Sequence, residues 1–308
     1  YFGRLVIGTP GKVCSEFDGK NCAVFADVLL LPERAVTVSQ RFGNHLYVSD
    51  FGDMRIKRFN LEGKYIDSFG EGKGRGPGEF QLIMGLTVNN NILYVQDPRK
   101  FTVQLFDISS TEYQDSFEVK YRPHRLVSVA DKLVAEAFNE KEIFKIHDKD
   151  GQVTAAFGKI IENQLQNSFS ITGELTPLPK ENSFIYAPAK ASYLMYYNLK
   201  GERVKTVITP DRIEFAESIK SETNDTRTLR SPQTSIRVDD ITTHEGKIYV
   251  LSNSRSADKQ SIVDVYNTKS GNYIRSFRLP NRARDILFGP EKMFVIDKAT
   301  EQIKAYGI

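Results

Sequence analysis

Glycine occupies every second position in FGEGKGRGPGEF, residues 69–80, from position 70 to position 78. Lys73 and Arg75 lie between these glycines, so a phosphate-binding loop is the first hypothesis to test. A dinucleotide-binding loop needs G-x-G-x-x-G, and a Walker loop needs G-x-x-x-x-G-K-[ST], each ahead of a helix. Neither spacing is met, and the following QLIMGLTVNNNILYVQD alternates as strands do. The stretch therefore predicts a connection between strands and not a nucleotide site.

The stretch lies inside a repeat. Six segments share the pattern of a strand, a short polar loop and a second strand, and they cover residues 45–60, 92–107, 132–148, 183–198, 247–267 and 292–308. Five of them place two apolar residues 12 positions apart, as Tyr47 and Phe59 are, and the remaining segment has a longer loop. E-G-K, D-G and S-G mark hairpin turns around them, because glycine takes the positive φ that such turns need. Four strands per unit and a period of roughly 40–50 residues are typical of a β-propeller.

This pattern predicts an all-β protein, a six-bladed β-propeller with four antiparallel strands per blade that forms a single domain over residues 1–308. The expected blades cover residues 24–70, 79–120, 121–158, 170–209, 234–279, and 281–308 together with 1–8. The sixth unit stops at Ile308 without a fourth strand, and the N-terminal FGRLVIG has no blade of its own. We therefore expect Phe2–Ile7 to pair beside Gln302–Tyr306 and to close the ring, which removes exposed sheet edges.

The glycine-rich segment, the strand that begins near Gly85 and the following YVQD together resemble an NHL-type repeat. The resemblance is specific over residues 43–107 and continues as a hydrophobic skeleton, with YVLS and FVID in later units. The whole chain is similar to the NHL-like and TolB-like six-bladed propellers found as exported proteins in Bacteroidetes-type bacteria, many without an assigned function. This resemblance implies the fold, but one propeller scaffold hosts enzymes, receptors and scaffolds alike.

The expected inner strands place polar residues at the mouth of a central channel. Counting nine residues back from a shared second-strand position gives Val38, Gly85, Arg125, Glu174 or Leu175, Asp240 and Asp285. His124 and Arg284 adjoin this ring and join the candidate ligand-binding set. Such a ring could bind a small ligand or one cation. The alternative, which we favour, is that these charges pair with one another or with ordered water.

Loops on the same predicted face add the candidates Lys73, Arg75, Asp97 and Arg99. We expect Asp97 and Arg99, between the second and third strands of a blade, to be solvated turn residues. The long segment 209–235 interrupts the connection between the fourth and fifth units. Connections this long carry function or are disordered, so we expect a flap over the channel face or an insertion.

No catalytic residue is predicted. The four histidines are scattered, G-x-S-x-G does not occur, and neither cysteine has a nearby histidine. A zinc-dependent lyase on NHL repeats would need several histidines at the channel, where only His124 is expected. A calcium-dependent lactonase-like propeller would need converging carboxylates, which Glu174, Asp240 and Asp285 could supply. We therefore predict no cofactor, while a channel cation such as calcium stays compatible with the sequence.

The net charge of +3 does not by itself indicate nucleic acid or a membrane as partner, and no apolar run reaches the roughly 20 residues that span a bilayer. Acidic residues share the face with the arginines, which argues against RNA. The sequence begins YFGRLV, so we expect a trimmed leader, and a lipid anchor in the precursor would fit it. Cys14 and Cys22 could form a local disulfide or remain free thiols.

The function expected from these observations is a non-catalytic propeller that binds a small-molecule ligand or a protein on its channel face, in an extracytoplasmic location (periplasm or cell surface). The alternatives are a metal-assisted hydrolase or lyase with its site at the channel mouth, and an RNA-binding NHL-type propeller.

Overall fold

The computed structural model describes residues 12–14, 22–29, 36–216, 219–223, 226–230, 236–254, 260–300 and 302–308. Within these ranges nearly all regular structure is β, as predicted. Helical structure among them is limited to two short 3₁₀ segments, η1 (Gln164–Asn167) and η2 (Pro179–Glu181). No helix among the described residues has the length and apolar character needed to cross a membrane.

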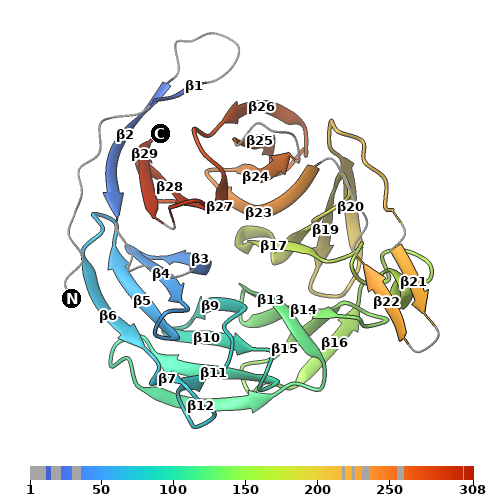
Figure 1. Cartoon of the computed structure of the whole chain (residues 1–308), viewed down its shortest axis with the longest axis horizontal. Helices are drawn as coiled ribbons and strands as arrows, with labels where there is room; N and C mark the ends of the chain where they lie inside the picture. Colours follow the sequence, from blue (N-terminus) through green and yellow to red (C-terminus); the bar gives the residue numbers. More distant parts are fainter. Residues whose placement is uncertain are drawn as a thin grey trace.

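Six antiparallel sheets stand around a common centre, each with its first strand innermost (Figure 1). Blade 1 contains β3 (Val36–Phe42), β4 (His45–Asp50), β5 (Arg55–Asn60) and β6 (Tyr65–Phe69). Blade 2 contains β9 (Gly85–Asn89), β10 (Ile92–Asp97), β11 (Thr102–Asp107) and β12 (Tyr113–Glu118). Blade 3 contains β13 (Arg122–Val129), β14 (Lys132–Phe138), β15 (Phe144–His147) and β16 (Val153–Phe157).

The second half of the ring repeats this order. Blade 4 contains β17 (Gly173–Leu178), β18 (Ser183–Pro188), β19 (Tyr193–Asn198) and β20 (Arg203–Ile208). Blade 5 contains β23 (Ile236–His244), β24 (Lys247–Ser254), β25 (Ser261–Asn267) and β26 (Tyr273–Arg278). Blade 6 contains β27 (Ala283–Phe288), β28 (Lys292–Asp297), β29 (Ile303–Gly307), β2 (Cys22–Leu29) and β1 (Lys12–Cys14). The predicted six-bladed propeller is thereby confirmed.

An N-terminal strand closes the ring, as expected, but it is not the strand that the sequence suggested. β2 pairs with β29 in the register Phe25↔Tyr306 to Leu29↔Ile303, and β1 adds a fifth strand outside it (Figure 1). The place beside β29 that we predicted for Phe2–Ile7 is therefore occupied by β2, and residues 2–7 lie outside the described residues. Several N-terminal runs have the length and apolar content of an outer strand, so composition did not distinguish them.

Buried apolar side chains fill each interface between neighbouring blades. At the first interface, Tyr47 and Phe69 of blade 1 pack with Phe106 of blade 2, and the rings of Phe69 and Phe106 lie 6.3 Å apart edge to face. Leu46 of blade 1 packs in the same way with Phe294 of blade 6. The two ends of the chain thus meet across a hydrophobic interface like those between sequential blades.

The glycine-rich loop holds its own carboxylate where a phosphate loop would hold an anion. Glu79 accepts a hydrogen bond from the backbone N–H of Gly76 at 2.6 Å, and a Cβ on Gly74 would lie 2.1 Å from the Glu79 Oε2. Gln104 accepts from the Gly78 N–H at 2.9 Å, and Lys100 Nζ donates to the Gly76 carbonyl at 3.0 Å. The loop also contains a short parallel pair, β7 (Gly72–Lys73) with β8 (Glu79–Phe80), which the sequence did not predict. Gly70, Gly72 and Gly78 adopt positive φ in this loop, and Gly74 and Gly76 lie against the Glu79 side chain.

Asp97, which ends the YVQD strand, is buried, so its prediction as a solvated turn residue is wrong. Its Oδ1 accepts from the backbone N–H groups of Arg99 at 3.0 Å and Lys100 at 3.2 Å, and its Oδ2 accepts from Gln81 N–H at 2.6 Å. One carboxylate therefore fixes the β10–β11 turn and ties it to the end of the glycine-rich segment. Asp297 accepts from two turn N–H groups in the same way in blade 6. Arg99, by contrast, is exposed, as predicted.

We expect Asp97→Ala to lower the free energy of unfolding by about 3 kcal/mol, because it removes the buried charged acceptor of three partly buried backbone N–H groups. Urea denaturation followed by circular dichroism measures the change. Asp131→Ala, in an exposed turn where the Asp131 side chain is 74% accessible, is the matched control and should change the stability little. Equal effects of the two substitutions would contradict the structural role of Asp97.

Candidate functional site

The inner strands of four blades are irregular at their starting ends: β3 shifts register between Val36 and Ser39, and the inner strands of blades 3, 5 and 6 share one pattern. The strand register skips one residue in each of these three, passing from Pro123 to Arg125, from Val238 to Asp240 and from Ala283 to Asp285. These are β-bulges, which insert an unpaired residue and turn the side chains around it. The inserted residues are His124, Asp239 and Arg284. Each is followed directly by the residue that the nine-residue count identified.

Each bulge therefore presents a doublet of ionisable side chains near the centre of the ring. We call the set the inner rim: its members are His124, Arg125, Glu136, Glu174, Asp239, Asp240, Arg284 and Asp285. Two members were not predicted from the sequence: Glu136, which is opposite Arg125 on β14, and Asp239. The doublets HR, DD and RD at equivalent positions are the sequence signal that could have revealed the bulges.

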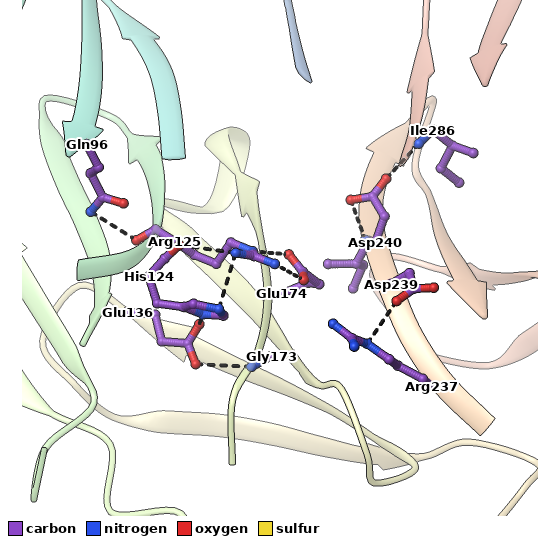
Figure 2. A network of polar contacts seen from close by, with 11 residues as sticks. Gln96, His124, Arg125, Glu136, Gly173, Glu174, Arg237, Asp239, Asp240 and Ile286 are labelled. Atoms are coloured by element: carbon purple, nitrogen blue, oxygen red, sulfur yellow. Dashed lines mark hydrogen bonds and ion pairs between the residues drawn. The ribbon is translucent and has the colours of Figure 1, made fainter. Parts of the chain in front are cut away.

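Arg125 and Glu174 form a two-pronged ion pair that joins blade 3 to blade 4 (Figure 2). Their side chains are 24% and 10% accessible. Burial lowers the pKa of Arg125, but the facing carboxylate of Glu174 outweighs this and the pKa is raised overall. Burial raises the pKa of Glu174, and Arg125 offsets only part of that effect. Such a pair fixes the relative position of two blades more than it adds stability.

Further hydrogen bonds extend this pair across three blades. Glu136 is buried, and its carboxylate accepts two hydrogen bonds. One comes from Nδ1 of His124 at 2.8 Å and the other from the backbone N–H of Gly173 at 3.0 Å. Gln96 of blade 2 donates to the Arg125 carbonyl at 3.3 Å (Figure 2). The network of His124, Arg125, Glu136 and Glu174 is therefore held in place by groups from blades 2, 3 and 4.

Asp240 plays the corresponding role between blades 5 and 6. Its carboxylate accepts from its neighbour Ile241 N–H at 2.7 Å and from Ile286 N–H of blade 6 at 2.9 Å (Figure 2). Burial is the main cause that raises the pKa of Asp240 well above its ordinary value, and the nearby carboxylate of Asp285 raises it further. Asp239 accepts from Arg237 Nε at 2.9 Å and from the side chain of Asn253.

The remaining predicted site residues are placed elsewhere. Gly85 lies opposite Gln96, and a Cβ there would meet Gln96 Oε1 at 2.4 Å, so its small size serves packing. Lys73 and Arg75 are exposed on the glycine-rich loop, and β7 runs along the outer edge of the ring beside β12 (Figure 1). Asp97 is buried in its turn. The structure thus brings Arg125, Glu174, Asp240 and Asp285 together, whereas Gly85 packs against Gln96 and the face loops lie apart.

The described residues contain no group of three His, Cys, Asp or Glu side chains arranged to hold a metal ion. Glu174 faces Arg125, and Asp240 accepts two backbone N–H groups, so their oxygens already have hydrogen-bond donors. These carboxylates would have to change partners to bind a cation.

A separate hollow lies between blades 4 and 5, where the long 209–235 segment begins. An open groove of about 520 Å³ is lined by Val207, Ile208, Pro210 and Tyr273, with Arg212 and Glu214 beside them. A smaller cavity of about 20 Å³ adjoins it and shares Thr209 and Tyr266. Apart from the unusual length of this connection, no sequence signal indicates the hollow.

Comparison with known proteins agrees with this architecture. A family profile described as TolB-like 6-blade propeller-like matches residues 40–288. The chain belongs to the TolB-like six-bladed propeller family. No curated protein matches the chain.

Solved structures similar to this TolB-like propeller share its fold at low sequence identity. A DUF4221 family member from Bacteroides vulgatus has a TM-score of 0.63 and 10% identity, covering 99% of this chain and 97% of its own. Virginiamycin B lyase from Staphylococcus aureus has a TM-score of 0.57 and 10% identity, covering 89% and 94%. A Bacteroides fragilis protein named as a presumed exported protein has a TM-score of 0.55 and 11% identity, covering 89% and 90%. At these identities the likeness concerns the fold alone.

A double-mutant cycle tests the ion pair between blades 3 and 4. Glu174→Leu should lower the free energy of unfolding by about 3 kcal/mol, because it leaves the partly buried Arg125 without its carboxylate. Arg125→Leu together with Glu174→Leu should cost clearly less than the sum of the single changes, as measured by urea denaturation. Additive costs would show that the two side chains do not interact in solution.

The raised pKa of Asp240 predicts a pH dependence of stability. Between the ordinary pKa of 3.8 and the raised value, the folded chain holds a proton that the unfolded chain has released. The free energy of unfolding therefore falls as the pH rises through this interval. Asp240→Asn should remove that fall. The variant is expected to be less stable by a constant amount because a hydrogen-bond acceptor is lost. Its free energy of unfolding relative to wild type should nevertheless rise as the pH rises through the interval. Denaturation at a series of pH values measures this, and a pH-independent difference would contradict it.

Proposed function

We propose that this TolB-like propeller is a non-catalytic binding protein that works outside the cytoplasm and holds its ligand or partner protein at the inner rim. The observation that carries the proposal is the repeated bulge, which sets doublets of ionisable side chains at equivalent places in three blades. Basic and acidic side chains both occur on this rim. A ligand that carries charges of both signs would find complementary groups there.

Preorganisation supports binding at this place. Arg125 and His124 are already held by Glu174 and Glu136, so a ligand would not have to order them. Arg237 is 58% accessible while its partner Asp239 is 11% accessible, which leaves one guanidinium at the edge of the rim for contact with a ligand. We therefore assign Arg237 the first contact with an anionic group of the ligand.

The same contacts favour binding over the metal-assisted hydrolase or lyase. A hydrolytic cation would need oxygen ligands from Glu174, Asp240 and Asp285, and the first two are committed to interactions between blades. Likeness to virginiamycin B lyase supports only the shared fold. The extracytoplasmic location is supported by the exported protein among the structural neighbours and by the family.

A thermal-shift screen of the whole chain tests the proposal. Amino acids, dipeptides, acidic and neutral sugars, and calcium chloride are the probes, each titrated against the wild type. We expect at least one zwitterionic probe to raise Tm in a saturable way, because binding to the folded state stabilises it. Arg237→Ala should weaken that binding at least tenfold without changing the fold, as measured by isothermal titration calorimetry.

Lys159→Ala is the control, because Lys159 is exposed and pairs only with the exposed Glu162 among the described residues. It should leave the affinity unchanged. Hydrolysis of a lactone or ester panel that depends on added calcium would favour the enzyme instead. Salt-sensitive binding of single-stranded RNA would favour the nucleic-acid alternative. The proposal that the inner rim binds the ligand would be refuted if no probe binds. It would also be refuted if the probes bind Arg237→Ala as tightly as they bind the wild type.

A further inference from the structure

The hairpin of β1 and β2 places the two cysteines of the chain opposite each other. The backbone register of this antiparallel pair runs Lys12↔Val24, Val13↔Ala23 and Cys14↔Cys22, so the cysteines pair at the end of β1 and the start of β2. These are the only cysteines in the 308 residues, and neither has another intrachain partner to compete for it. Sequence spacing alone left both a disulfide and two free thiols open.

The register favours the disulfide. Directly opposed residues of an antiparallel pair share one face of the sheet and have Cα atoms about 4.5 or 5.5 Å apart. A disulfide needs a Cα separation of about 4.4–6.8 Å. Both kinds of antiparallel pair fall within this range, whereas a register shifted by one residue would put the cysteines on opposite faces.

We propose that Cys14 and Cys22 form a disulfide that fastens the ring-closing hairpin. Formation of the S–S bond releases two protons and two electrons from the thiols. A small disulfide such as oxidised glutathione accepts both and leaves as two thiols, by thiol–disulfide exchange. The proposal rests on the strand register and not on ligand binding at the inner rim, so each can fail without the other.

The proposed bond lies beside the strand that closes the ring, where it would stabilise the closure. β2 lies between β1 and β29, and it joins the start of the chain to its end. β2 and β29 are distant in the chain, so only non-covalent contacts hold them together. Neighbouring strands elsewhere in the blades are consecutive in the chain and are joined by their connecting turns. A covalent link from β2 to β1 keeps a second strand on the outer edge of β2 and reduces the freedom of the unfolded N-terminal segment. An oxidising location, as proposed for this protein, would preserve such a bond.

Thiol counting tests the bond directly. The full chain is equilibrated with oxidised glutathione, denatured without reductant in N-ethylmaleimide, and its mass is measured. We expect no maleimide adducts before reduction and one on each of the two cysteines after reduction. Peptide mapping should identify a cross-linked pair containing Cys14 and Cys22. Two maleimide adducts before reduction, or an intermolecular link, would overturn the proposal.

Thermal denaturation tests the stabilising role. Reduction of the wild type with a phosphine should lower Tm by roughly 5 °C, given the usual contribution of a disulfide. The Cys14→Ser, Cys22→Ser double variant should match the reduced wild type and should not respond to the phosphine. An equal response of both proteins would contradict the role of the bond in closure. If the variant does not fold, the thiol count on the wild type still decides whether the bond exists.

Discussion

The pairing of β2 with β29 is the constraint on which the rest of the molecule depends. It joins residues from the two ends of the chain, and the apolar contact of Leu46 with the Phe294 cluster reinforces it across the neighbouring interface. Without this strand, β29 would be the edge of an open sheet. With it, each blade packs on two neighbours, and the starting ends of all inner strands are fixed relative to one another.

Polar side chains near the centre complete what the apolar interfaces begin. Gln96 reaches from blade 2 to blade 3, Arg125 pairs with Glu174 of blade 4, and Asp240 accepts from the backbone of blade 6. Each of these groups has a partner in a neighbouring blade, so the inner rim contributes to the ring as well as to the proposed binding surface. A ligand that binds there would also stabilise the arrangement of the blades.

The sequence predicted the blades well because their signals are local: alternating apolar residues, glycine turns and a repeated spacing. It also located Arg125, Glu174, Asp240 and Asp285, since these follow from counting within a repeat. It did not predict β2 as the closing strand, because strand choice there depends on pairing with residues almost 280 positions away. The bulges and the burial of Asp97 were also missed, as both depend on which backbone groups the fold brings near.

Residue-level hydrogen exchange on β29 tests closure most directly. In an interior strand, amides on both edges are hydrogen-bonded, so the amides of Ile303–Tyr306, which pair with both β2 and β28, should exchange slowly. An edge strand would leave every second amide open to water. Uniform protection along β29 in the intact chain is the result that this structure predicts. Fast exchange at alternate positions would show that β2 does not close the ring.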